Sequence, residues 1–233
     1  MMKNLYLILN FATLIIPFIA SFYPKYPFYK NWKVAFKAIF ISAFLFILWD
    51  FFYTYLAVWG FNPKYITGIN IFNLPIEEML FFFCIPYASL FTYFALQSLI
   101  KLNPLQKYEN NISNLLLIFL VFFGSFHFPK LYTSFTCLGL AMFLIYLKFI
   151  HKASFLADFY LMFFFILIPF FIVNGILTGS FIPEEIVWYN DAENSKIRMF
   201  TIPFEDTFYG MFLLLLNVFL YELLKTQKTR IKK

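Results

Sequence analysis

Apolar residues along this chain form long blocks, and short segments between the blocks hold most of the charges. A helix needs about 20 apolar residues to cross the ~30 Å hydrocarbon layer of a bilayer. Seven blocks approach or reach that length: 4–21, 34–58, 75–99, 113–128, 131–150, 157–177 and 203–224. The pattern predicts seven transmembrane helices. The fourth block is short, and only a tight turn separates it from the fifth.

The composition supports an all-α integral membrane protein. Of the 233 residues, 62% are hydrophobic and 13% are charged, which is typical of membrane proteins and excludes a soluble globular core. Cys84 and Cys137 fall inside predicted spans with no metal-like or disulfide-like spacing, so we interpret them as packing residues. His127 and His151 are predicted at opposite membrane faces, where they cannot share a metal ion.

Positive charges are distributed unevenly between the predicted loops. One side carries thirteen of the 18 Lys and Arg residues and the other side carries five. Because cytoplasmic loops are enriched in Lys and Arg, we expect a multi-pass protein of the cell membrane with its N-terminus outside and its C-terminus in the cytoplasm. The lysines at 25–37 predict that the first block stays a span and is not a cleaved signal peptide. The basic tail is then a topology signal, and we expect no nucleic-acid partner.

One short pattern occurs twice. Residues 72–82 are FNLPIEEMLFF and residues 200–210 are FTIPFEDTFYG, so Phe, Pro and Glu recur at a spacing of 128 residues. Val58-Trp59 also aligns with Val187-Trp188 if one gap is allowed. The sequence predicts two homologous halves of three spans each with a linking span between them, and such halves run parallel in the membrane.

Both copies place two adjacent carboxylates at the start of a predicted helix, after Pro75 or Pro203. The four acids are Glu77, Glu78, Glu205 and Asp206. Proline and acids are both favoured in a first helical turn, so capping explains part of the pattern. Charges beside apolar membrane segments are nevertheless expensive and usually functional. We therefore interpret the repeated pair as a candidate site whose two motifs lie at the same membrane face.

Paired carboxyl groups predict acid chemistry. Neighbouring carboxyls oppose each other's ionisation, and a partly desolvated pair retains a proton near neutral pH. Such a pair can donate a proton to a weak base and stabilise developing positive charge. The 38 Phe and 16 Tyr residues include rings whose faces could stabilise a carbocation.

The two Pro-x-acid-acid motifs resemble those of the lycopene cyclases of the heterodimeric type, here in a single chain with both homologous halves. The resemblance also includes the run VNGILTG at 173–179, the pair Tyr189-Asn190 and the pair Trp49-Asp50. It implies a first repeat at 1–111, a linking helix at 112–129 and a second repeat at 130–233.

The resemblance implies a carotenoid end-group cyclase that converts the ψ ends of lycopene, or of a related linear carotenoid, to β-ionone rings without net redox change. By motif position, it implies that Glu77, Glu78, Glu205 and Asp206 are catalytic. Asp50, Asn174, Tyr189 and Asn190 are accessory candidates. The chain lacks a GxGxxG or GxxxxGK run, so we expect no dinucleotide cofactor, and we expect no metal. The lipid bilayer and other enzymes of carotenoid synthesis are the expected partners.

Two other acidic segments have simpler interpretations. NDAEN at 190–194 is similar to the Asp-rich magnesium sites of membrane prenyltransferases, but it has no second Asp-rich motif and lies in a loop. Glu184-Glu185 has no counterpart in the first half, so we expect it to be solvated. Asp50 lies inside the second predicted span, where an acid is a functional candidate, although a structural hydrogen bond explains it nearly as well.

Other functions remain open from the sequence. A related membrane hydratase would add water to the same cation. A seven-span transporter with parallel repeats is an alternative from another class, although such repeats usually carry their proline at mid-membrane, where a helix hinges. A seven-span receptor fits least well.

Overall fold

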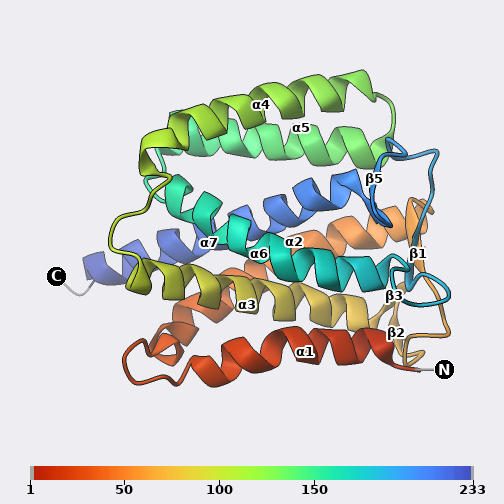
Figure 1. Ribbon diagram of the computed structural model, residues 1–233, viewed down its shortest axis with the longest axis horizontal. Coiled ribbons are helices and arrows are strands. Elements are labelled where there is room, and N and C mark those ends of the chain that lie inside the picture. Colours follow the sequence, from red (N-terminus) through yellow and green to blue (C-terminus); the bar gives the residue numbers. More distant parts are fainter. Residues whose placement is uncertain (1–2, 232–233) are drawn as a thin grey trace. The chain divides into compact units, whose positions relative to one another are not determined.

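The computed structural model describes residues 3–231, and most of them are helical. The helices are labelled in Figure 1. Their bounds are α1 Leu5–Ala20, α2 Trp32–Tyr55, α3 Ile76–Leu99, α4 Glu109–Phe126, α5 Leu131–Ile145, α6 Leu156–Leu177 and α7 Phe204–Ile231. Short 3₁₀ helices precede α2 (η1, Phe28–Asn31) and α4 (η2, Gln106–Tyr108), and a π-helical segment (η3, Tyr146–His151) continues α5.

Six of the seven predicted spans are confirmed as helices long and apolar enough to cross a membrane. The first predicted span is the exception, because α1 has only 16 residues. The count of seven spans therefore stays a prediction. The uncertain fourth and fifth spans are two separate helices, α4 and α5, joined by residues 127–130. Helix α7 continues past the predicted end at 224 into the basic tail.

The chain divides into two compact units. The first contains α1, α2, α3 and the part of α7 from Leu213 onward. The second contains Ala57–Gly60 and residues from Ile100 to Phe212. Each unit thus includes a segment from the other half of the sequence.

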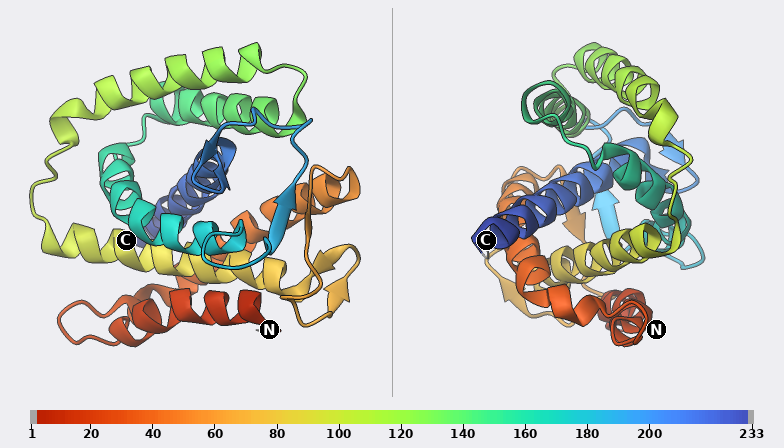
Figure 2. Two further views of the ribbon diagram at one scale, coloured as in Figure 1. Left: turned by 45° about the vertical axis from the view of Figure 1, so that its right-hand side comes forward. Right: turned by 90° about the vertical axis from the view of Figure 1, so that its left-hand side faces the viewer.

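In the first unit, α1 and α2 both pack along α3, as Figure 2 shows for α1. A buried polar contact joins this group to α7, since the Asn217 amide donates to the Pro86 carbonyl at 3.2 Å and accepts from the Ser42 hydroxyl at 3.3 Å. A second contact lies at the next residue of α3, where the Ser21 and Tyr87 hydroxyls are 2.7 Å apart.

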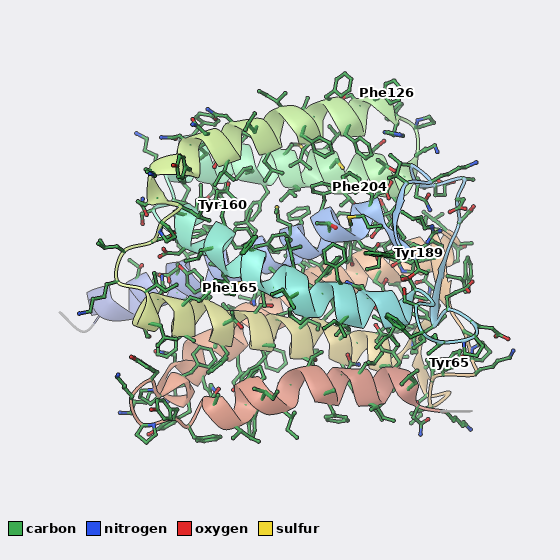
Figure 3. The ribbon with its side chains drawn as sticks, viewed as in Figure 1. Tyr65, Phe126, Tyr160, Phe165, Tyr189 and Phe204 are labelled. Atoms are coloured by element: carbon green, nitrogen blue, oxygen red, sulfur yellow. The ribbon has the colours of Figure 1, made fainter. Side chains whose placement is uncertain are left out.

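In the second unit, α4 and α5 lie side by side (Figures 1 and 2). A hydroxyl pair, Ser113 and Tyr160 at 2.7 Å, connects α4 to α6. Many apolar side chains point outward from the helices, such as Phe126 on α4, which is 73% exposed (Figure 3). An outward apolar surface is the expected surface of a helix that faces lipid.

Short strands connect the helices, and one pair joins the two sequence halves. Strand β1 (Trp59–Phe61) pairs with β4 (Val187–Tyr189), and the Asn190 N–H donates to the Val58 carbonyl at 2.9 Å. Glycine is needed in β1, because a Cβ at Gly60 would lie 2.3 Å from Cζ2 of Trp188.

A β-hairpin with the same backbone precedes α3 and α7. The first hairpin is β2 (Asn70–Ile71) and β3 (Leu74–Pro75), and the second is β5 (Arg198–Met199) and β6 (Ile202–Pro203). Each turn has a phenylalanine with positive φ, 57° at Phe72 and 59° at Phe200, which is rare for an aromatic residue. The internal repeat therefore includes the backbone conformation of this loop.

Two details of the predicted helix starts are resolved in the structure. All four motif acids lie in the first turn of α3 or α7, as predicted. The motif prolines were also predicted in the first helical turn, but they lie outside the helices. Pro75 and Pro203 are the last residues of β3 and β6 and directly precede the helices, where a missing N–H costs no hydrogen bond of the helix.

Candidate functional site

The first acid pair is buried at the start of α3. Glu77 is 0% exposed and Glu78 is 8% exposed. The Thr67 backbone N–H donates to Glu77 Oε1 at 2.6 Å, and the Tyr6 hydroxyl on α1 donates to Glu78 Oε2 at 2.5 Å. The Asn10 amide of α1 donates to the Glu77 carbonyl at 2.7 Å. Two contacts from α1 and one from the hairpin loop thus fix this pair.

The second acid pair has the same setting at the start of α7. Glu205 is 0% exposed and Asp206 is 6% exposed. The Ser195 N–H donates to Glu205 Oε1 at 2.6 Å. The Tyr132 hydroxyl on α5 donates to Asp206 Oδ1 at 2.5 Å.

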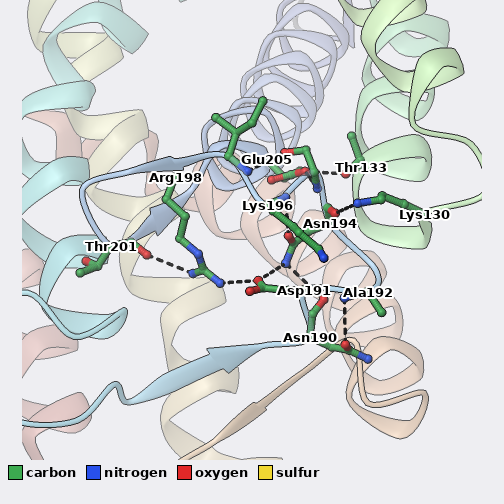
Figure 4. Close-up of polar contacts among 12 residues, drawn as sticks. Lys130, Thr133, Asn190, Asp191, Ala192, Asn194, Lys196, Arg198, Thr201 and Glu205 are labelled. Atoms are coloured by element: carbon green, nitrogen blue, oxygen red, sulfur yellow. Dashed lines mark hydrogen bonds and ion pairs between the residues drawn. The ribbon is translucent and has the colours of Figure 1, made fainter.

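The second pair also receives two further hydroxyl groups. The Thr133 hydroxyl donates to Glu205 Oε1 (Figure 4). The Tyr189 hydroxyl donates to Asp206 Oδ2 at 3.0 Å, so both oxygens of that carboxyl accept a tyrosine hydrogen bond. Tyr189, an accessory candidate from sequence, therefore belongs to this cluster.

The first acid of each pair has one side-chain oxygen without a hydrogen-bond partner in the described residues. Glu77 Oε2 and Glu205 Oε2 are buried and have no hydrogen-bond partner among residues 3–231. A buried polar oxygen without a partner costs about 1–3 kcal/mol, so an arrangement that keeps one in both repeats points to a use for it. The unpartnered atom is the same one in the two copies.

The two clusters differ in the chemistry of their surroundings. Thr133 follows the tyrosine of α5, whereas Leu7 follows the tyrosine of α1. Tyr209 on α7 has Phe81 as its counterpart 128 residues earlier. In the second unit, Trp59 has its ring centroid 5.0 Å from that of Tyr132 and 5.8 Å from that of Tyr209. The second cluster is therefore richer in hydroxyl groups.

The NDAEN loop supports the second cluster. Residues 3–231 contain no group of three or more His, Cys, Asp or Glu that could hold a metal ion. Glu193 accepts from the first N–H groups of α5, through its side chain from Leu131 at 3.2 Å and through its carbonyl from Tyr132 at 2.9 Å. The Lys130 ammonium donates to the Asn194 carbonyl at 2.5 Å (Figure 4). The loop thus fixes the helix start that carries Tyr132.

An ion pair between Arg198 and Asp191 also holds this loop. Arg198 donates to Asp191 Oδ1 at 2.8 Å (Figure 4), and this hydrogen bond lowers the pKa of the Asp191 carboxyl below its usual value. The same guanidinium lies 5.8 Å from the ring centroid of Tyr189. Because Asp191 is exposed, the pair orders the loop and adds little stability.

The three other accessory candidates lie in α2, in α6 and directly after β4. Asp50 is 1% exposed and lies in α2 next to Phe51, whose carbonyl accepts from Asn73 of the hairpin at 3.0 Å. Asn174 is in α6, and its carbonyl accepts from Thr178. Asn190 accepts from the Ala192 N–H at 3.0 Å and so shapes the loop.

Cys84 and Cys137 are free and buried. Glu184 and Glu185 are exposed between α6 and β4.

Sequence reasoning missed the residues that hold the acids in place. The two tyrosines share one sequence feature, because Leu5-Tyr6 and Leu131-Tyr132 each begin a helix of their repeat. Thr67 and Ser195 open a short pattern, [Thr/Ser]-x-Ile, at the same spacing as the acids. Both signals are too short to stand out without the hydrogen bonds.

Comparison with known proteins supports the repeat. The family model described as lycopene cyclase matches residues 3–96 and 129–224, which is most of the chain. Each matched region contains one complete acid cluster with its tyrosine. No curated protein and no solved structure matches the chain.

Proposed function

Because this chain belongs to the lycopene cyclase family, we propose that it closes β-ionone rings at the ψ ends of lycopene or a related linear carotenoid. A carboxylic acid protonates the terminal double bond, and the resulting tertiary cation is attacked by the nearby internal double bond. The ring carbon then loses a proton. The product is an isomer of the substrate, so the enzyme is of the intramolecular lyase or isomerase type.

The observation that carries this proposal is the buried acid pair that occurs in both repeats with the same contacts. Glu77 and Glu205 each have one oxygen held by a backbone N–H and one buried oxygen without a partner in the described residues. Acid catalysis on an alkene needs a carboxyl group that is positioned but not neutralised by a cation. We propose that the catalytic residues are Glu77, Glu78, Glu205 and Asp206, with Pro75 and Pro203 ending the hairpins before them.

The proposed reaction needs no cofactor or metal, because proton gain and proton loss balance. Its substrate reaches the protein through the lipid bilayer, and other enzymes of carotenoid synthesis are proposed partners. The sequence division at 1–111, 112–129 and 130–233 also remains our proposal for the repeats and their linking helix.

Expression of this chain alone in a lycopene-accumulating bacterium should convert the red linear pigment to monocyclic or bicyclic β-products, since both repeats are in one polypeptide. Chromatography with mass spectrometry would identify the pigments. Pigment that stays linear while the protein is in the membrane would contradict the proposal. A hydroxylated linear product would instead indicate the hydratase reaction, and an unmodified pigment moved across the membrane would indicate transport.

We propose that the N-terminus lies outside the cell membrane and the C-terminus in the cytoplasm. Reporter fusions after Lys30, Lys107, Lys152 and Lys233 should then report cytoplasm, because they lie in the lysine-rich segments. Fusions at Lys64 and Ser195 should report the exterior. If the reporters at Lys64 and Ser195 gave opposite signals, the two acid pairs would lie at different membrane faces, and the proposed topology would be wrong.

A further inference from the structure

The two acids of each pair have different surroundings, and this difference suggests different roles. In Glu77 and Glu205, Oε1 is held at 2.6 Å by a backbone N–H, and Glu205 Oε1 also accepts from the Thr133 hydroxyl. Oε2 is buried with no partner within the described chain. An ionised oxygen in that position would lack any donor to stabilise its charge. A protonated oxygen there can point at a carbon–carbon double bond, which is not an ordinary hydrogen-bond acceptor.

The second acid of each pair is held by hydroxyl donors. Tyr6 donates to Glu78, and Tyr132 and Tyr189 donate to the two oxygens of Asp206. The 2.5 Å distances from Tyr6 and Tyr132 lie within the range for a hydroxyl bonded to a carboxylate anion. These contacts suit an ionised carboxylate.

We infer that Glu77 and Glu205 donate the proton through Oε2, and that Glu78 and Asp206, positioned by Tyr6 and Tyr132, remove the proton that closes the reaction. This inference rests on the proposed function and divides its four acids into two donors and two acceptors.

The steps balance without a co-reactant. The O–H bond of the donor breaks and a C–H bond forms at the terminal double bond. A ring C–C bond forms as the internal double bond attacks the cation. The acceptor carboxylate then takes a proton from the ring carbon, and the C–H electron pair becomes the ring double bond. The proton returns from acceptor to donor before the next ring is closed.

The test compares products of two double variants expressed with lycopene. Glu77→Gln with Glu205→Gln should stop substrate consumption, since no donor remains. Glu78→Gln with Asp206→Asn should keep consumption within about tenfold of the parent, because general acid catalysis is retained. Its products should shift from β-rings to rings with the double bond elsewhere, or to hydroxylated ends, because the cation loses a different proton or takes up water.

A second pair of variants, with smaller changes, separates a loss of chemistry from a loss of folding. Tyr6→Phe with Tyr132→Phe keeps both carboxylates and removes only the hydroxyls, so it should give part of the same product shift. Tyr87→Phe and Tyr160→Phe are matched controls, since these hydroxyls bond to Ser21 and Ser113 away from the acids. The controls should give β-rings only.

The inference would be overturned if the Glu78 and Asp206 variant stopped consumption as completely as the donor variant, with the tyrosine variants making only β-rings. It would also be overturned if the Glu78 and Asp206 variant made β-rings alone. Failure of the proposed function is a separate result, because the parent itself would then form no rings.

Discussion

Glutamine at both Glu77 and Glu205 in one chain should reduce ring formation by about 10²–10⁴-fold, the usual contribution of general acid catalysis. The amide keeps the size and the Oε1 contact with the loop N–H, but it cannot supply a proton. Rates would be measured in membranes of lycopene-accumulating cells at matched protein levels.

The control for this prediction is Glu184→Gln. Glu184 is exposed and lies outside both acid clusters, so its variant should cyclise at the parent rate. If the carboxylates only capped α3 and α7, the Gln variants would lose around 1 kcal/mol of stability and keep near-normal activity. Ring formation within a few-fold of the parent in the double variant would show that these acids are not the donors, and Asp50 would be tested next.

Alanine at Gly60 should lower the free energy of unfolding by about 1–3 kcal/mol, the usual cost of an overpacked site. The added Cβ would lie 2.3 Å and 2.5 Å from ring atoms of Trp188, so β1 and β4 must separate or the ring must move. A thiol-reactive dye can follow thermal unfolding in detergent, since Cys137 is buried in the same unit. A Cys84→Ala background removes the signal of the other unit.

Two further variants test the cause of that loss. A Cβ at Gly175 would meet Ser180 atoms at 3.5 Å and 3.6 Å, ordinary contact distances, so Gly175→Ala should change stability little. In a Trp188→Ala background, Gly60→Ala should cost almost nothing, because the atoms it would meet are gone. An equal cost in both backgrounds would mean that β1 needs glycine for another reason.

Apolar block length located the helices well because crossing a bilayer sets a minimum length that sequence shows directly. It located α1 less well. Residues 4–21 form an apolar block, but Asn4 has a left-handed backbone and the helix ends at Ala20, so only 16 residues are helical. Apolar block length also could not show that α7 continues past residue 224, because charged residues such as lysine can extend a helix beyond its apolar part.

The acids of the site were visible in sequence because they recur with proline at a fixed spacing. Their neighbours were not. Tyr6 is 72 residues from Glu78, and Tyr132 is 74 residues from Asp206, so only the packing of one helix on another brings each pair together. The hairpin contact is local in sequence, but it is made by a backbone N–H, which any residue except proline can supply. The short pattern that begins at Thr67 and Ser195 was therefore not enough to predict their role.

The units of the structure do not coincide with the halves of the sequence. Trp59 and Gly60 come from the first half but belong to the second unit, and α7 from Leu213 onward comes from the second half but belongs to the first. If the gene were split between α3 and α4, neither fragment would contain all the parts of one unit. Asn217 would be absent when Ser42 and Pro86 are synthesised. Two separate polypeptides would thus have to be made together and complement each other, each completing the other's fold as they assemble.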